Sequence, residues 1–154
     1  MNLRTLIERV FFTFACCLAM SLPVSAAEFT IPFEMDAGGQ PLDGSTHRYT
    51  ITFAADDLPP AQAWELVLYN LPQQDFVANA IHRHALESRM LKSLVRDKNG
   101  NVTIYIQHNP PRGKRQANWL PAADGPFLMQ LRLFDPQPSV LDAAWEAPPV
   151  ERVE

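Results

Sequence analysis

The chain has 154 residues, with 13 lysines and arginines against 17 aspartates and glutamates, and its formal net charge is −4. This length is typical of a single domain. The mild acidity argues against a protein that holds a nucleic-acid backbone, because that function needs a basic face.

Residues 1–27 have the three-part pattern of a secretory signal peptide. Arg4 and Arg9 form the charged start, residues 10–22 are apolar, and small residues end the segment at Ala27. The apolar run is shorter than the ~20 residues that a membrane-spanning helix needs, which favours cleavage over an uncleaved anchor. We therefore expect a periplasmic or secreted protein with no stable membrane anchor after cleavage.

Both cysteines, Cys16 and Cys17, lie inside this segment. The expected mature domain, residues 28–154, therefore has no disulfide and no nucleophilic thiol. Its stability must come from an apolar core, and a chain of this length is sufficient to bury one.

Three strands are predicted in the first half of the mature chain. They are a short edge strand from Glu28 to Phe33, which Pro32 ends, and two regular strands, His47 to Phe53 and Ala63 to Tyr69. The two regular strands alternate with a period of two residues. The side chains that this pattern turns inward are Tyr49, Ile51, Phe53, Trp64, Leu66 and Leu68.

The segment from Phe76 to Leu94 is ambiguous. Leu86, Met90 and Leu94 recur at helical spacing, and residues 80–94 contain good helix formers. The local pattern alone predicts a helix here, and an irregular segment is the alternative.

Asn99-Gly100 predicts a β-hairpin, because this dipeptide between apolar runs is a strong turn signal. The arms of the hairpin would be residues 94–96 and 102–108. In the second arm, Val102, Ile104 and Ile106 would face inward.

The most regular alternation in the chain follows residue 126. Phe127, Met129, Leu131 and Leu133 share one side of a predicted strand, and Trp119 precedes it in a loop rich in proline and glycine. Residues 150–153 predict a last edge strand. Short strands separated by prolines are typical of a mainly antiparallel, all-β sandwich or barrel, with room for one short helix.

Several motifs occur in a fixed order along the chain. They are Asp43-Gly44, HRYTITF, Leu58-Pro59-Pro60, AWELVLYN, RHALESR, Asn99-Gly100, VTIYIQH, NWLP, GPFLMQLRLFDP and VLDAAWEAPPV. This ordered set, which spans residues 42–153, resembles the bacterial family called domain of unknown function 1214.

The resemblance implies a jelly-roll-like β-sandwich in which Arg83 to Arg89 is extended or irregular. Members are often fused behind domain of unknown function 1254, which implies a separately encoded protein of that kind as a partner here. The chain departs from the family at Ala63-Trp64-Glu65, where Phe-Trp-Ser is usual, and at Arg83-His84, where Arg-Tyr is usual. The resemblance supplies no catalytic residue.

Four residues are candidates for a ligand site, namely Glu65, His84, Trp119 and Arg132. His82 and His84 would project to one side of a strand, as two zinc ligands must, and His47, His108 or Glu65 would supply a third ligand. Arg132 lies on a partly covered strand face, where a structural ion pair with a carboxylate such as Glu65 is favoured over an anion site.

The basic cluster Arg112, Lys114 and Arg115 sits in a proline- and glycine-rich loop, and its simplest interpretation is a solvated loop tip. The mature chain has no nucleophile-elbow motif and no cysteine. We expect no cofactor and no nucleic-acid partner. The leading hypothesis is a non-catalytic ligand- or protein-binding module of the envelope. The alternatives are a hydrolase or metal-dependent enzyme using His82, His84 and Glu65, and an envelope structural protein.

Overall fold

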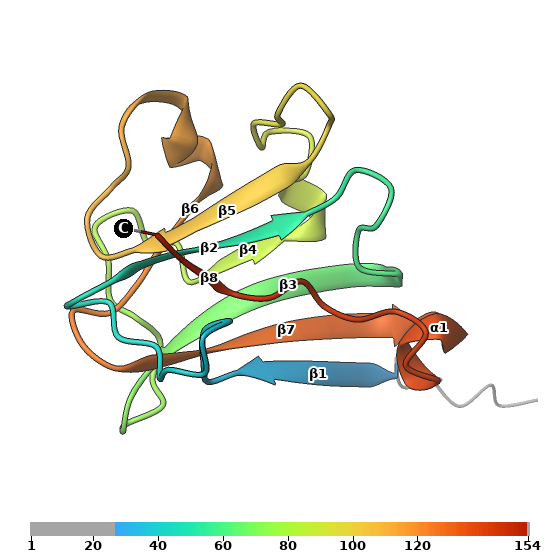
Figure 1. The fold of residues 1–154 in the computed structure, drawn as a ribbon, viewed down its shortest axis with the longest axis horizontal. Helices are drawn as coiled ribbons and strands as arrows, with labels where there is room; N and C mark the ends of the chain where they lie inside the picture. The colour runs from blue at the N-terminus through green and yellow to red at the C-terminus, as the bar shows by residue number, and fades with distance from the viewer. Residues whose placement is uncertain (1–26, 154) are drawn as a thin grey trace, which may run out of the picture.

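A computed structural model describes residues 27–153 (Figure 1). The predicted signal peptide, apart from Ala27, lies outside the described residues, and its cleavage stays a prediction. The eight strands in residues 27–153 form two four-stranded sheets that lie face to face. This arrangement confirms the expected mainly antiparallel, jelly-roll-like β-sandwich.

The first sheet has the strand order β1-β7-β3-β4, and each neighbouring pair is antiparallel. Its strands are β1 (Glu28–Phe33), β7 (Phe127–Pro136), β3 (Ala61–Asn70) and β4 (Ala85–Glu87). Leu66 lies opposite Leu131 in the register, and Glu65 lies opposite Arg132. Because side chains alternate along a strand, the leucines face the second sheet and the charged pair faces outward.

The second sheet has the strand order β6-β5-β2-β8. Its strands are β6 (Trp119–Pro121), β5 (Val102–Gln107), β2 (Arg48–Phe53) and β8 (Glu151–Val153). The pair β5 and β6 is parallel, and the other two pairs are antiparallel. The expected last edge strand is therefore present as β8.

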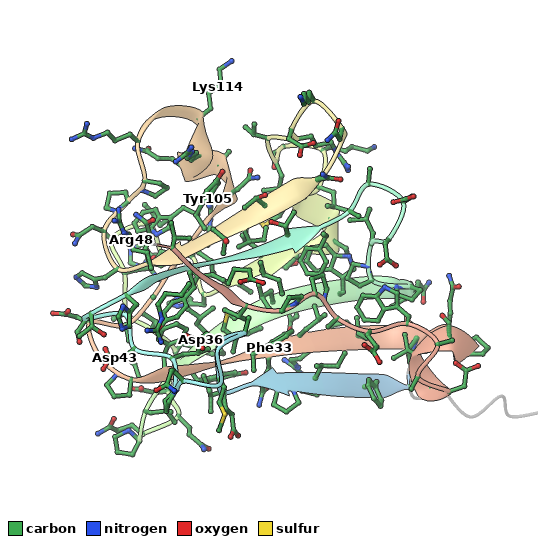
Figure 2. The ribbon with its side chains drawn as sticks, viewed as in Figure 1. Phe33, Asp36, Asp43, Arg48, Tyr105 and Lys114 are labelled. Atoms are coloured by element: carbon green, nitrogen blue, oxygen red, sulfur yellow. The ribbon has the colours of Figure 1, made fainter. Side chains whose placement is uncertain are left out.

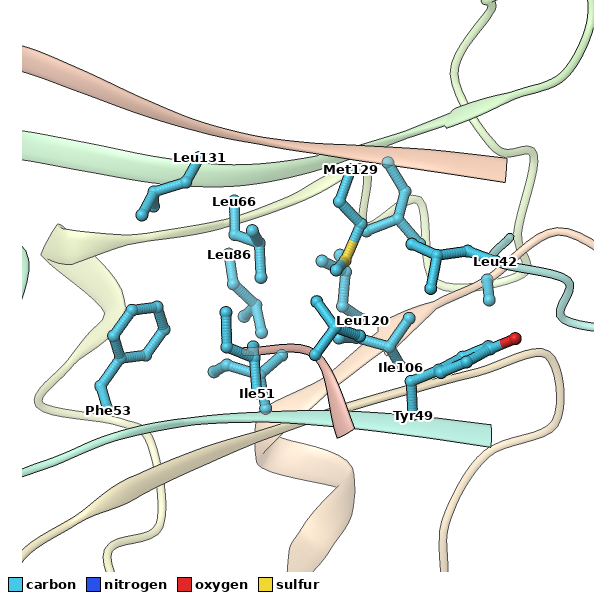
Figure 3. Close-up of a cluster of buried hydrophobic side chains, with 14 of the residues drawn as sticks. Leu42, Tyr49, Ile51, Phe53, Leu66, Leu86, Ile106, Leu120, Met129 and Leu131 are labelled. Atoms are coloured by element: carbon cyan, nitrogen blue, oxygen red, sulfur yellow. The ribbon is translucent and has the colours of Figure 1, made fainter. Parts of the chain in front are cut away.

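The core lies between the two sheets (Figure 3). Side chains from β7, such as Met129 and Leu131, meet side chains from β2, such as Ile51 and Phe53, and all four are fully buried. Burial of one large apolar side chain stabilises the fold by about 1.5–3 kcal/mol. The residues that the alternation assigned to the interior are all buried, namely Tyr49, Ile51, Phe53, Trp64, Leu66, Leu68, Val102, Ile104, Ile106, Phe127, Met129, Leu131 and Leu133.

The helix that the local pattern predicts for Phe76 to Leu94 is wrong. The segment contains strand β4 and the short 3₁₀ helix η1 (Ser88–Met90). Leu86 in β4 pairs with Leu66 and is fully buried, so packing against β3 overrides helix propensity. The extended or irregular conformation that the family resemblance implied is confirmed.

The predicted hairpin at Asn99-Gly100 is only partly formed. The turn is present, since Asp97 and Asn101 are joined by a backbone hydrogen bond of 3.0 Å, and β5 is its second arm. The first arm is not a strand. The side chain of the buried Asn118 bonds both backbone groups of Val95, so a side chain takes the place of a neighbouring strand.

The end of the described chain is fixed by an ion pair. Asp36 is buried, and its carboxylate accepts hydrogen bonds from the backbone N–H groups of Gly38 and Gln40. It also accepts one from Nε of Arg152 in β8, at 2.9 Å. Before β8 lies a short helix, α1 (Pro138–Leu141), which the sequence patterns did not predict. None of the helices in residues 27–153 has the length and apolarity that a membrane crossing requires.

Candidate functional site

Glu65 and Arg132, two of the four predicted site residues, lie together on the outer face of the first sheet. Nη1 of Arg132 donates a 2.7 Å hydrogen bond to Glu65, and its Nε donates one of 2.8 Å to Glu28 in β1. The hydrogen bond from Arg132 holds the pKa of Glu28 below its usual value. Arg132 also lies 5.6 Å from the ring centre of Phe134. The expected structural ion pair is present, and it ties three neighbouring strands together.

His84 belongs to a column of three rings at the edge of the same sheet. Its ring is tilted against Phe76 with centroids 5.4 Å apart, and Phe76 stacks on Tyr69 of β3 at 5.4 Å. Nδ1 of His84 lies 3.1 Å from the carbonyl oxygen of Val77. The histidine therefore holds the loop after β3 in place.

His82 and His84 do not have the geometry expected of two metal ligands. Both residues precede β4, and His82 has a left-handed backbone with φ of 51°. Side chains from such a bend do not project to a common side as they do on a strand. Within residues 27–153, no group of three histidine, cysteine or acidic side chains gathers where it could hold a metal ion.

Trp119 is not in a loop, as the sequence suggested, but in strand β6. It is 7% exposed, and its indole Nε1 donates a 2.8 Å hydrogen bond to the carbonyl oxygen of Gln107 at the end of β5. The Trp119 side chain therefore packs within the sheet, and little of its surface is exposed to a ligand. The four predicted residues thus form no common site.

A concavity lies in a different place, at the end of the second sheet. It has a volume of about 600 Å³ and an open mouth. We call it the basic cleft, after the side chains that dominate its lining: His47, Arg48, Gln107, His108, Arg112 and Arg115.

One wall of the basic cleft is a tight turn before β2. The Asp43 carboxylate accepts hydrogen bonds from both the N–H and the hydroxyl of Ser45, and the N–H of His47 bonds the Asp43 carbonyl at 3.1 Å. Gly44 is required in this turn, because a Cβ atom there would lie 2.2 Å from the carbonyl oxygen of Ala123. The turn is therefore held firmly against the loop that precedes β7.

The opposite wall follows β5. The backbone carbonyl of Gln107 accepts hydrogen bonds from Trp119 and from the N–H of Ala122, and Nδ1 of His108 lies 3.3 Å from the Ala122 carbonyl. Pro111 is buried beneath the loop that carries Arg112. These contacts fix the backbone from which the basic side chains of this wall extend.

The basic cleft has cations without matching anions. Arg48, Arg112 and Arg115 have no carboxylate within 4.0 Å among residues 27–153. The acidic group near His47 is Asp43, whose pKa is lowered chiefly by the Ser45 hydroxyl and backbone hydrogen bonds and also by the charge of His47. Figure 2 shows Arg48 at the end of the second sheet, beside the loop that leads to Lys114.

Sequence reasoning missed the basic cleft because its walls are about sixty residues apart in the chain. In the register of β2 and β5, Tyr49 lies opposite Ile106. Continued two residues further, this register sets His47 opposite His108. The motifs HRYTITF and VTIYIQH each carry a histidine at the end that becomes the cleft, and this shared feature was the available signal.

The comparison with known families agrees with the order of motifs and with the fold. The model for the family described as "Protein of unknown function (DUF1214)" matches residues 27–138. The chain belongs to this family. No curated protein matches the sequence.

Two solved structures have a similar fold to this DUF1214 domain. One is the VPA0106 protein from Vibrio parahaemolyticus, with a TM-score of 0.71 and 26% identity over 82% of this chain and 31% of that chain. The other is a putative uncharacterized protein from Burkholderia cenocepacia, with a TM-score of 0.51 and 16% identity over 84% of this chain and 30% of that chain. The present chain thus spans about a third of the length of either protein.

Proposed function

We propose that the protein is a non-catalytic binding module of the bacterial envelope, and that it binds an anionic ligand in the basic cleft. The envelope location rests on the signal-like pattern of residues 1–27. One observation carries the choice of ligand: three arginines line one concave surface without a carboxylate partner in residues 27–153. The chain as a whole has a formal net charge of −4, so a concavity lined by arginines departs locally from its overall acidity.

Arginine suits this role because its planar guanidinium presents several fixed donors to an oxyanion. Arg48, Arg112 and Arg115 donate no hydrogen bond to another residue in the described part of the chain. Their donors are therefore free to bind a carboxylate, sulfate or phosphate group. The rigid walls at Gly44 and Gln107 limit the reorganisation that binding requires.

The first experiment measures binding of sulfate and citrate by isothermal titration calorimetry. We expect each of R48Q, R112Q and R115Q to weaken binding about tenfold, the loss typical of one charge-assisted hydrogen bond. The control is R89Q, because Arg89 is exposed and basic but lies outside the cleft, paired with Glu87. Failure of both anions to bind, or an equal loss in R89Q, would remove the proposal.

A protein partner is a second candidate, favoured by the outer face of the first sheet. Leu128, Phe134 and Tyr69 lie there only half-buried, and Phe76 beside them is 54% exposed. In the two similar structures, the matched region is about a third of a longer chain, so it has further chain to contact. The partner proposed is a separately encoded protein of the 1254 type.

Co-purification tests the partner. We expect the tagged protein to recover the 1254-type protein from its own cells, and L128R to abolish recovery by placing a charge on the outer face. The matched control is K98Q, on an exposed turn of the second sheet. Recovery of no such protein rules this candidate out.

The enzymatic alternative finds no support in the geometry. Glu65 is held by Arg132, and His84 is held by Val77 and Phe76. His82 stands apart on a left-handed turn. A general base and a metal ligand set both need side chains that converge on one point.

A further inference from the structure

Two histidines line the basic cleft together with its arginines, one on each wall. His47 comes from the turn before β2, and His108 follows the last residue of β5. His108 is exposed and His47 is half-buried, so water reaches both rings. Histidine is the side chain whose charge ordinarily changes between pH 5 and pH 8, and the arginines beside it keep their charge throughout.

The surroundings of His108 fix which ring nitrogen carries the proton in the neutral form. Nδ1 lies 3.3 Å from the carbonyl oxygen of Ala122. A carbonyl oxygen only accepts hydrogen bonds, so Nδ1 is the donor in this contact. Nε2 of the neutral ring then carries a lone pair and no proton. Neutral His108 therefore repels the oxygen of an anion at Nε2, whereas the protonated ring offers it a charged N–H donor.

His47, on the opposite wall, already has a carboxylate nearby. Hydrogen bonds from Ser45 are the main cause of the lowered pKa of Asp43, and the charge of His47 contributes to it. Asp43 therefore stays ionised between pH 5 and pH 8 and does not titrate with the histidines. The ring of His47 packs edge-on against Tyr49, with centroids 6.3 Å apart. A change of charge on this wall in that range comes from His47 itself.

The charges that line the cleft are positive. In the part of the chain that the structure describes, the lining holds three arginines and no carboxylate. The charged residues of neighbouring segments that do not line it are Asp36, Asp43, Lys114, Asp124, Glu151 and Arg152. Of these, Asp36 and Arg152 form an ion pair with each other. A bound anion is thus the negative partner that this lining lacks for a protonated His108.

We infer that the basic cleft binds its anion together with a proton, held chiefly by His108, so that the affinity falls as the pH rises. This inference rests on the proposed anion-binding function and adds its regulation. The protonated ring binds the anion better, and the bound anion favours the protonated ring by the same factor. Histidine ordinarily carries this proton below a pKa of about 6.5 and loses it above that value. The cleft holds its ligand in mildly acidic surroundings and releases it as the pH rises.

The test is calorimetric binding of sulfate at pH 5, 6, 7 and 8 and constant ionic strength, because sulfate stays a dianion throughout this range. We expect the affinity to fall about tenfold from pH 5 to pH 8, the value of one charge-assisted hydrogen bond. Titrations near pH 7 in buffers of different ionisation enthalpy should show net proton uptake on binding. In H108Q, which cannot titrate, the fall should shrink to about threefold or less, and in the double variant H47Q/H108Q it should disappear.

The matched control is H82Q, because His82 is exposed and lies outside the cleft. Its sulfate affinity should fall with pH as in the parent. Thermal melts check that H108Q is folded, and H108N supplies a second side chain that does not titrate.

A sulfate affinity that is the same at pH 5 and pH 8 would overturn this inference and leave the anion site standing. A fall in H108Q and H108N as steep as in the parent would also overturn it, because another group would then titrate. A fall that disappears in H82Q would place the proton outside the cleft. If sulfate binds at no pH, the proposed function itself fails.

Discussion

Asn118 and Val95 exchange two hydrogen bonds of 2.7 Å, one from the Val95 N–H to the Asn118 side-chain oxygen and one from the Asn118 amide to the Val95 carbonyl. The same amide donates a third bond, of 2.9 Å, to the carbonyl of Thr103 in β5. Asn118 is 2% exposed, so water does not reach these groups freely. The Asn118 side chain therefore supplies the hydrogen bonds that a neighbouring strand would otherwise form with Val95.

The substitution N118A should lower the free energy of unfolding by about 1–3 kcal/mol, because it leaves buried backbone groups of Val95 and Thr103 unsatisfied. Chemical denaturation with urea measures this loss. N109A serves as the control, because Asn109 is exposed, and it should change stability by less than about 0.5 kcal/mol. A loss in N118A no larger than that in the control would contradict the role assigned to Asn118.

Arg83 joins the loop before β4 to the end of the 3₁₀ helix η2 (Gly113–Asn118) by hydrogen bonds. Its Nη1 lies 2.7 Å from the Trp119 carbonyl, 3.2 Å from that of Ala117 and 3.3 Å from that of Gln116. We expect R83M to cost about 1–3 kcal/mol in urea unfolding and R83K to cost less, since lysine keeps a charged donor. Equal losses for the two variants would contradict the expectation that a charged donor at this position recovers part of the stability.

The lowered pKa of the Asp36 carboxyl predicts that the fold loses stability in acid. Backbone hydrogen bonds, first from Gln40, and the Arg152 ion pair lower the pKa of its carboxyl below the usual value. The unfolded chain then binds more protons than the folded chain in the window between the lowered pKa and about 3.9, the ordinary value for aspartate. Stability from this group is complete above that window and falls as pH drops through it.

The variant D36N tests this dependence. We expect it to be less stable at neutral pH and to lose less further stability between pH 5 and pH 2 than the parent, in thermal melts at each pH. The acid slope will not vanish, because the carboxyls of Glu28, Asp43 and Asp97 also have lowered pKa values. A D36N slope as steep as that of the parent would mean that Asp36 is not a contributor.

Glu65 and Arg132 should not affect ligand binding in the basic cleft, because they lie on the other sheet and face outward. We expect E65Q and R132Q to leave the Kd for sulfate within about twofold, since exposed charges separated by more than a Debye length are screened. Partly exposed ion pairs contribute little, so E65Q should cost about 0–1 kcal/mol. A loss of sulfate binding in R132Q would move the anion site to the first sheet.

Elemental analysis tests the metal hypothesis for His82, His84 and Glu65. Protein purified without chelators should contain no stoichiometric zinc, iron or copper, and H82A and H84A should have the same metal content as the parent. H84A should nonetheless lower the melting temperature, because it removes a ring from the column with Phe76 and Tyr69. Metal bound at one equivalent and lost in both variants would revive the enzymatic hypothesis.

Period-two alternation predicted β2, β3, β5 and β7 and their inward side chains, because burial of one sheet face leaves a direct trace in the sequence. The same reasoning failed where a single tertiary contact decides the structure. Leu86 enters the core as part of a three-residue strand, and the Asn118 side chain forms the hydrogen bond that the backbone of Val95 needs. Neither contact leaves a local pattern in the sequence. The ion pair of Arg132 with Glu65 was predictable, because both lie on regular strands whose faces could be assigned.

The basic cleft could not be predicted from local pattern. Its lining comes from the turn before β2, from the end of β5 and from the loop that carries Arg112, and only strand pairing brings these together. Arg112 and Arg115 were interpreted as a solvated loop tip because their neighbours in space are distant in the sequence. Knowledge of the pairing between β2 and β5 would have been enough to place His47 and His108 side by side.

The pairing of β1 with β7 and of β2 with β8 has a consequence for synthesis of the chain. Each pair joins segments roughly a hundred residues apart, so a growing polypeptide on the ribosome cannot complete either layer until its last quarter has emerged. A premature stop before Phe127 would leave β1 and β3 without the strand that lies between them. We therefore expect truncation products to be removed by proteolysis rather than to accumulate as a smaller domain.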